Sequence, residues 1–159
     1  MISKKTFTGA VIWITGLSGS GKTTLATKIT ENLRERTSYS VVFLDGDILR
    51  EVFGKEGLQL NSYDRMQRLE LAKKYSFLSN ILSQQGHIVV IATISLFKEI
   101  HHWNRKNIKN YIEAYLNVPV SVLKKRDPKG LYRKFSEGKL KNIYGLDMDF
   151  DEPENPDFI

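Results

Sequence analysis

The chain has 159 residues, a formal net charge of +6 and no cysteine. This length suits one domain with its own hydrophobic core, and the absence of thiols excludes a disulfide scaffold and any metal site built on cysteine. The longest apolar run, residues 10–14, is far shorter than the roughly 20 residues that cross a bilayer, and residues 1–5 do not begin a signal peptide. We therefore expect a single cytoplasmic domain over residues 1–159 with no membrane partner.

Short apolar runs alternate with segments of helical periodicity along the chain. The runs predict strands at residues 11–15, 41–44, 88–93 and 111–116, and the first three are nearly continuous, as in strands covered on both faces. The apolar spacing between the runs predicts helices at residues 23–36, 64–85, 97–109 and 120–125. This alternation predicts an α/β fold, a mainly parallel, doubly wound sheet with helices on both faces.

The last part of the chain differs in charge from the rest. Residues 98–141 hold 12 basic and 4 acidic residues, a local net charge of +8, whereas the remainder carries −2. The polar, poorly periodic composition of this region predicts a mobile lid at roughly residues 126–145, followed by an extended acidic tail at residues 147–159. A basic segment of this kind binds nucleic acid, binds small phosphorylated ligands or is solvated surface.

The strongest chemical signal follows the first predicted strand and opens the first predicted helix. Residues 16–23 fit the pattern G-x-x-x-x-G-K-[ST], in the context that a phosphate-binding loop requires. Glycines let successive backbone N–H groups point at one anion, Lys22 reaches the β- and γ-phosphates, and the Thr23 hydroxyl is a ligand for Mg²⁺. The sequence thus predicts a P-loop NTPase fold with the cofactors ATP and Mg²⁺. The expected ATP-binding residues are Gly16, Leu17, Ser18, Gly19, Ser20, Gly21, Lys22, Thr23 and Thr24.

Two carboxylates, Asp45 and Asp47, follow the second predicted strand, at the sheet edge where ligands bind in open α/β folds. One of them can serve the metal and the other can accept the proton of an attacking hydroxyl; the alternative is a turn with an N-cap aspartate. The strand at residues 88–93 ends without an aspartate and no Asn-Lys-x-Asp motif is present, which favours a small-molecule kinase over a GTPase. Arg50 and Arg65 suit a bidentate grip on an anionic acceptor, or else form surface ion pairs.

A nucleic-acid-binding ATPase module is the alternative from a different class of function. Only the basic stretch supports it, because the interleaved exposed aromatic residues and the motifs of nucleic-acid-binding domains are absent. We therefore expect no nucleic-acid partner.

Ordered motifs along nearly the whole chain resemble those of the adenylylsulfate (APS) kinase family of P-loop kinases. Besides the phosphate loop they are Leu44-Asp-Gly-Asp47 with Arg50, Asp64-Arg65, Ile94-Ser95, Arg126-Asp-Pro-Lys-Gly-Leu-Tyr132, Gly145-Leu-Asp147 and Pro153-Glu-Asn-Pro156. The resemblance implies a phosphotransferase with an alcohol group as acceptor, which moves the ATP γ-phosphate to the 3′-hydroxyl of adenylylsulfate in sulfate assimilation. Members of the family are often homodimers.

The resemblance also implies roles for individual residues. Lys22, Asp45, Asp47 and Ser95 are the expected catalytic residues, Thr23 and Asp45 the metal ligands, and Arg126 joins the ATP-binding residues. The expected acceptor-binding residues are Asp47, Arg50, Arg65, Ile94, Ser95, Lys129, Leu131 and Ile143. Ser95 matches a serine that is regarded in the family as a phosphoserine intermediate, but in-line transfer needs no covalent relay, so we expect Ser95 to hydrogen-bond the acceptor.

The departures from the family pattern concentrate on the acceptor side. Ile48 replaces an asparagine, Leu96 replaces a proline, and the segment Gln67-Arg68-Leu69-Glu70 stands where the family has Glu-Asn-Ile-Arg. Two phenylalanines that sandwich the acceptor's adenine align with Leu60 and Ile143. Stacking of one base on an aromatic ring contributes roughly 1–3 kcal/mol in nucleic-acid sites, so this loss affects the choice of acceptor. Adenylylsulfate and another nucleotide-like acceptor, such as the cytidine diphosphoramidate of capsule biosynthesis, both stay open, since a smaller pyrimidine can accept aliphatic walls.

Overall fold

A parallel four-stranded sheet forms the centre of the protein. The computed structural model describes residues 8–54 and 63–159. Strands β1 (Ala10–Gly16), β2 (Val41–Asp45), β3 (Ile88–Ala92) and β4 (Tyr111–Leu116) lie in the order β2-β3-β1-β4. Every residue of β3 is buried, which explains its unbroken apolar sequence. The predicted parallel α/β sheet is confirmed.

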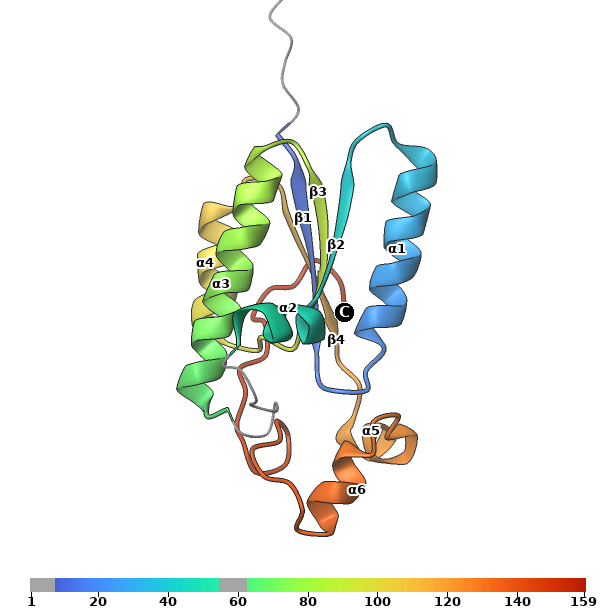
Figure 1. Ribbon diagram of the computed structural model, residues 1–159, viewed down its shortest axis with the longest axis vertical. Helices are drawn as coiled ribbons and strands as arrows, with labels where there is room; N and C mark the ends of the chain where they lie inside the picture. Colours follow the sequence, from blue (N-terminus) through green and yellow to red (C-terminus); the bar gives the residue numbers. More distant parts are fainter. Residues whose placement is uncertain (1–7, 55–62) are drawn as a thin grey trace, which may run out of the picture.

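Helices cover both faces of this sheet, as Figure 1 shows. Helix α1 (Lys22–Arg36) lies on one face, and α3 (Arg65–Gln84) and α4 (Lys98–Asn107) lie on the other. Alternation along each strand divides the core accordingly, so that Trp13 belongs to the α3–α4 side and Ile14 to the α1 side. The doubly wound arrangement is thereby confirmed.

Two helices were not predicted from the sequence. Helix α2 (Gly46–Phe53) follows β2 directly, and α6 (Leu131–Ser136) lies inside the segment expected to be a mobile lid. Helix α2 starts on glycine and has eight residues, so its periodic signal is limited to two apolar pairs four residues apart, Ile48 with Val52 and Leu49 with Phe53. Helix α6 depends on Asp127, whose carboxylate accepts the backbone N–H groups of the first helical residues.

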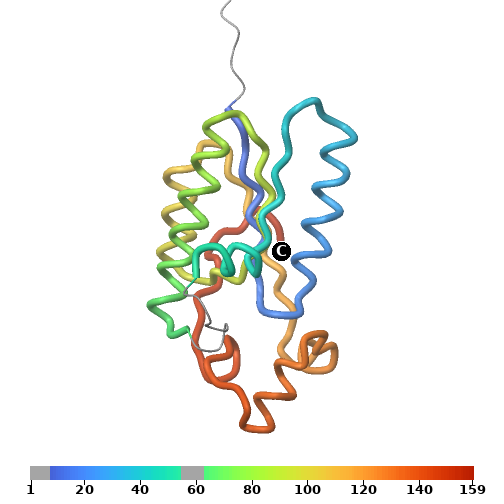
Figure 2. Tube along the Cα trace, viewed as in Figure 1, coloured from blue at the N-terminus to red at the C-terminus, as the bar shows by residue number. Residues whose placement is uncertain are grey.

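The lid segment packs against the phosphate loop. After α5 (Val120–Arg126), helix α6 lies at the carboxyl end of the sheet, and the chain then turns back along the sheet (Figure 2). The buried Tyr132 of α6 donates from its hydroxyl to the carbonyl oxygen of Ser18 at 3.0 Å. This contact fixes α6 over the phosphate loop, and the role of the segment as a moving lid stays a prediction.

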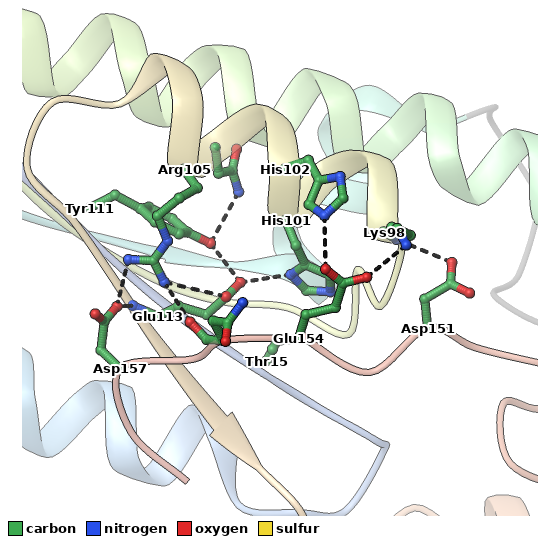
Figure 3. A network of polar contacts seen from close by, with 12 residues as sticks. Thr15, Lys98, His101, His102, Arg105, Tyr111, Glu113, Asp151, Glu154 and Asp157 are labelled. Atoms are coloured by element: carbon green, nitrogen blue, oxygen red, sulfur yellow. Dashed lines mark hydrogen bonds and ion pairs between the residues drawn. The ribbon is translucent and has the colours of Figure 1, made fainter.

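The acidic tail is an extended strap that ties α4 to β4. Glu154 pairs with Lys98 at 2.6 Å and Asp157 pairs with Arg105 at 2.9 Å, as the dashed lines in Figure 3 mark. The backbone of Asp157 and Phe158 bonds to Glu113 of β4, so the tail covers the outer edge of that strand. Ion pairs between the basic segment and the acidic tail thus account for part of the charge difference that the sequence shows between them.

Asp151 attaches the tail to the first residues of α3 and α4. Its Oδ2 accepts from Arg65 Nη2 at 2.7 Å and from the backbone N–H of Lys98 at 3.1 Å. The α4 N-cap residue, Phe97, offers no side-chain acceptor, so Asp151 caps the helix from elsewhere in the chain.

We expect Asp151→Ala to lower the free energy of unfolding by about 1 kcal/mol, the usual contribution of a helix cap. Urea unfolding followed by circular dichroism measures the change. Asp149→Ala removes an equal charge from an exposed position of the same tail and serves as the matched control. An equal loss in both variants would show that tail charge, and not the cap on α4, stabilises the protein.

Candidate active site

A cavity of about 530 Å³ opens at the carboxyl ends of β2 and β3, beside the phosphate loop. Its walls come from the phosphate loop and start of α1, from α2, α3 and the end of β3, and from the lid. This is the edge at which open parallel sheets bind ligands. One end therefore lies on the expected donor residues and the other on the expected acceptor residues.

Lys22 is folded back onto its own loop at the donor end. Its Nζ donates to the carbonyl oxygen of Leu17 at 2.7 Å and to Ser20 Oγ at 3.5 Å. Gly19 and Gly21 have φ values of 80° and 99°, a backbone conformation that lets the loop turn tightly around an anion. Burial lowers the pKa of Lys22 to about 8, and the charge of Lys129 acts in the same direction, against the opposing carboxylates of Asp47 and Asp45.

This pKa predicts how ATP affinity depends on pH. Lys22 carries its positive charge below pH 8 and loses it progressively above, so we expect the Kd for ATP of the free protein to rise between pH 7.5 and 9.5. Titration calorimetry across this range measures it. The variant Lys22→Arg keeps its charge throughout, and its Kd is expected to change at least threefold less over the same interval. A pH dependence as steep in Lys22→Arg as in the parent chain would assign the effect to another group.

The side-chain oxygens of Thr23, at the start of α1, and Asp45, at the end of β2, lie close together and are both hard ligands. Thr23 Oγ1 donates to Asp45 Oδ2 at 3.0 Å, and Asp45 Oδ1 accepts the backbone N–H of Asp47 at 2.8 Å. Asp45 therefore caps α2, as the alternative predicted, and it also lines the cavity beside Thr23. Its role toward the metal stays a prediction. No group of three or more His, Asp or Glu side chains fit for a metal occurs in residues 8–54 and 63–159. The pair nevertheless fits Mg²⁺, which takes its other ligands from phosphates and water.

Asp47 lies between the two ends of the cavity and is held by cations on both sides. Its Oδ1 accepts from Arg50 Nη1 at 2.9 Å, and its Oδ2 accepts from Lys129 Nζ of the lid. Burial pushes the pKa of Asp47 upward, but the hydrogen bond and charge of Lys129 and the charge of Arg50 outweigh it and lower the pKa. A carboxylate held in this way can orient a hydroxyl and can receive its proton late in a transfer.

The cavity includes most of the expected site residues and leaves out several. Ser18, Gly19, Gly21, Lys22, Thr23, Thr24 and Arg126 line it at the donor end, and Asp47, Arg50, Ile94, Ser95, Lys129 and Leu131 line the rest. Gly16, Leu17 and Ser20 are buried and do not line it. Leu60 lies outside the described residues.

Arg65 and Ile143 are not where the resemblance led us to expect them. The guanidinium of Arg65 pairs with Asp151 and lies 5.1 Å from the centroid of the Phe97 ring, outside the cavity wall. The side chain of Ile143 is 4% exposed and packs in the core. Arg65 is held by the tail and Ile143 by the core. Both sets of contacts link segments that are far apart in the sequence.

Ser95 lines the cavity in a constrained conformation. Its φ of 25° is unusual for a residue with a Cβ, and its Oγ lies 2.7 Å from Thr93 Oγ1. The two hydroxyls form a buried pair in which one donates to the other, and this geometry keeps Ser95 at the cavity edge.

Four larger side chains of the acceptor end were not among the expected site residues, although Arg68 lies in a segment noted as a departure from the family pattern: Arg68, Tyr75, Phe97 and Tyr144. Arg68 and Tyr75 share one face of α3 with Leu71, at spacings of three and four residues. That spacing is visible in the sequence and predicts a common face. It could not show that the face meets the cavity.

Comparison with known proteins identifies the family. The family model for adenylylsulphate kinase matches residues 8–159. The cytidine diphosphoramidate kinase of Campylobacter jejuni is 42% identical over 144 residues, with 91% of this chain and 81% of that protein covered. The adenylyl-sulfate kinase of Rippkaea orientalis is 38% identical over 149 residues, covering 94% and 80%.

Solved structures agree with this assignment. The Mycobacterium tuberculosis APS kinase in complex with AMPPNP and APS superposes with a TM-score of 0.83 and 32% identity, covering 96% of this chain and 87% of that one. None of the helices within residues 8–54 and 63–159 has the length and apolar character to cross a membrane. The chain belongs to the adenylylsulphate kinase family and is a phosphotransferase with an alcohol group as acceptor.

Proposed function

We propose that this chain transfers the γ-phosphate of ATP to the 3′-hydroxyl of adenylylsulfate, with Asp47 orienting that hydroxyl. The observation that carries the proposal is the position of Asp47 in the cavity, between the phosphate loop and the guanidinium of Arg50. Lys22 at one end and Arg50 at the other supply positive charge for two anionic ligands. A hydroxyl held by Asp47 then faces the terminal phosphate of the donor.

Mg²⁺ belongs to this proposal as a partner of ATP. Thr23 and Asp45 would hold it, since their oxygens already meet at 3.0 Å. When bound, Mg²⁺ neutralises charge on the β- and γ-phosphate oxygens. Lys129 supports the same end from the lid: it bonds to Asp47 in the present structure and carries its ammonium group at the boundary between donor and acceptor.

Cytidine diphosphoramidate is the second candidate acceptor. Two observations favour it: a 42% identical relative has this name, and the Ile143 position of the adenine clamp is a buried aliphatic side chain. Without an aromatic ring at position 143, the acceptor loses one stacking partner that the family pattern provides for a large purine, and so a pyrimidine acceptor competes better.

The distribution of basic residues argues against the nucleic-acid-binding alternative. Lys98 and Arg105 pair with acids of the tail, and Lys129 points at Asp47 in the cavity. These three cations serve the fold and the site, so only part of the basic excess is left for a nucleic-acid surface. Retained acceptor turnover in a protein that does not bind a 20-mer oligonucleotide at 150 mM salt agrees with the kinase proposal.

An acceptor comparison tests the proposed function. ADP release with ATP and Mg²⁺ is measured against adenylylsulfate and against cytidine diphosphoramidate, with ATP alone as the blank. We expect turnover of adenylylsulfate at micromolar concentration. Negligible turnover there, together with turnover of the cytidine compound, would replace the first candidate by the second. No turnover with either would contradict the acceptor class.

A homodimer is the assembly that the family resemblance implies, and it stays a prediction. Light scattering on the purified chain should give twice its 18.3 kDa mass. A mass of 18.3 kDa at micromolar concentration would contradict it.

A further inference from the structure

The phosphate loop contacts the lid and α5 at two consecutive residues. The hydroxyl of Tyr132, in α6, donates to the carbonyl oxygen of Ser18 at 3.0 Å. A Cβ placed on Gly19 would lie 3.4 Å from Cδ of Pro128 and 3.9 Å from Cδ2 of Leu123, so the loop packs closely against this part of the chain. Tyr132 does not line the cavity and was not among the expected site residues. Any effect of its hydroxyl on ATP therefore passes through the loop.

Residues 17–20 form a β-turn within the phosphate loop. The N–H of Ser20 donates to the carbonyl oxygen of Leu17 at 3.2 Å, and Gly19, at the third position of the turn, has a φ of 80°. These are the features of a type II turn. A type I turn closes with the same hydrogen bond, but its central peptide, here Ser18–Gly19, is rotated by roughly 150–170°. Glycine is compatible with both types, so the residues of the turn alone do not fix the orientation of this peptide.

The hydrogen bond from Tyr132 favours one of these two orientations. The C=O and N–H groups of a planar trans peptide point in opposite directions, so a bond that holds the Ser18 carbonyl toward α6 also holds the Gly19 N–H away from α6. Gly19 lines the cavity, and its N–H has no hydrogen-bond partner in the part of the chain that the structure describes. This N–H is therefore available to a phosphate oxygen of ATP, as the N–H groups of such loops are.

Tyr132 is itself held firmly. Its side chain is 5% exposed and belongs to the same core cluster as Leu17 and Leu123. Burial and the negative charge of Asp127 raise the pKa of Tyr132, so its hydroxyl keeps its proton and acts as a donor at physiological pH. The carboxylate of Asp127 also accepts the backbone N–H of Tyr132 at 3.1 Å, which fixes the first turn of a helix too short to be stable alone.

We propose that Tyr132 is a positioning residue of the donor site: its hydrogen bond to the Ser18 carbonyl keeps the Ser18–Gly19 peptide in the orientation in which the Gly19 N–H binds a phosphate oxygen of ATP. This inference rests on the proposed kinase function and deepens it, because it makes the conformation of the phosphate loop depend on a residue of the lid. Without the hydroxyl the peptide can rotate. The Ser18 carbonyl oxygen, and not an N–H, would then face the negatively charged phosphates.

Tyr132→Phe tests the inference, because it removes only the hydroxyl and keeps the ring in its packing. The Kd for ATP with Mg²⁺, measured by titration calorimetry, should rise about fivefold or more, since part of the population loses a hydrogen bond to a charged group. With whichever acceptor the parent chain turns over, the acceptor KM at saturating ATP should change less than about twofold, because the acceptor end does not contact this peptide. A purely structural role of the hydroxyl predicts a lower melting temperature with an unchanged Kd for ATP.

Asp127→Asn provides a second variant that loosens Tyr132 without changing it. Asp127 uses one carboxylate oxygen for the N–H of Tyr132 and the other for that of Arg133, and asparagine keeps only one acceptor oxygen. Its Kd for ATP should rise about two- to fivefold, less than in Tyr132→Phe, because the hydroxyl is still present. If Tyr132→Phe fails to fold, an unchanged Kd for ATP in folded Asp127→Asn overturns the inference.

Tyr111→Phe is the matched control. It removes another buried tyrosine hydroxyl, which donates to Glu113 at 2.8 Å, from the start of β4 and so from the opposite end of the sheet to the cavity. Its melting temperature should fall, while its Kd for ATP should equal that of the parent. An unchanged Kd for ATP in folded Tyr132→Phe, or an equal rise in Tyr111→Phe, would overturn the inference and leave the kinase function standing. A parent chain that does not bind ATP, or that binds it and turns over neither acceptor, would instead contradict the proposed function.

Discussion

Lys22→Ala is expected to lower kcat/KM for acceptor phosphorylation about a thousandfold or more while the protein keeps its fold. Lys22 lies at the donor end of the cavity, where its ammonium group would meet charge that develops on the transferring phosphate. Removal of one preorganised donor from a transition state costs roughly 10²–10³ in rate, and loss of a full charge costs more.

The same substitution should leave the melting temperature unchanged or higher. Burial lowers the pKa of Lys22 to about 8, below its ordinary value of 10.5, so folding disfavours the charged form of this residue at neutral pH. Alanine removes that cost. Steady-state ADP release and thermal unfolding measure both effects, and Lys28→Ala on the exposed face of α1 is the control. A rate within tenfold of the parent would refute the assigned role of Lys22.

Asp47→Asn should lower kcat by roughly 10²–10⁴, the range of a lost general base, with an ATP KM within twofold of the parent. Asparagine fits the same space but cannot accept the acceptor's proton. It also loses the ionic hold of Arg50 and Lys129 on the side chain. Single-turnover measurements with saturating ATP report the chemical step directly.

Asp45→Asn provides the contrast, because Asp45 meets Thr23 at the nucleotide end. This variant should mainly raise the Mg²⁺ concentration that gives half-maximal rate. Equal kinetic profiles for the two variants would show that the aspartates do not have separate roles, and an unchanged kcat in Asp47→Asn would remove Asp47 from the mechanism.

The sequence predicted the sheet and the long helices because their signals are local. A buried strand such as β3 is apolar throughout, and the periodicity of α1 and α3 extends over several turns. Helices α2 and α6 were not predicted because they are short and each begins at or directly after a glycine. Asp127 stabilises α6 from four residues before its start, a contact that residue periodicity does not reveal.

The donor half of the site could be predicted for the same reason. The phosphate loop is one continuous segment, so its sequence motif is sufficient to predict its conformation. The acceptor half brings α2, α3 and residues near Tyr144 together, and long-range packing decides which side chains reach the cavity. Arg65 illustrates this, because its partner Asp151 lies 86 residues away in the chain.

The most direct test of the account is the identity of the product. The purified chain is incubated with ATP, Mg²⁺ and adenylylsulfate, and the nucleotides are separated and analysed by mass spectrometry and ³¹P NMR. The account predicts ADP together with adenylylsulfate that has gained one phosphate on its 3′-hydroxyl, and no such product from Lys22→Ala. ADP formed without a phosphorylated acceptor, or a product formed equally by Lys22→Ala, would contradict it.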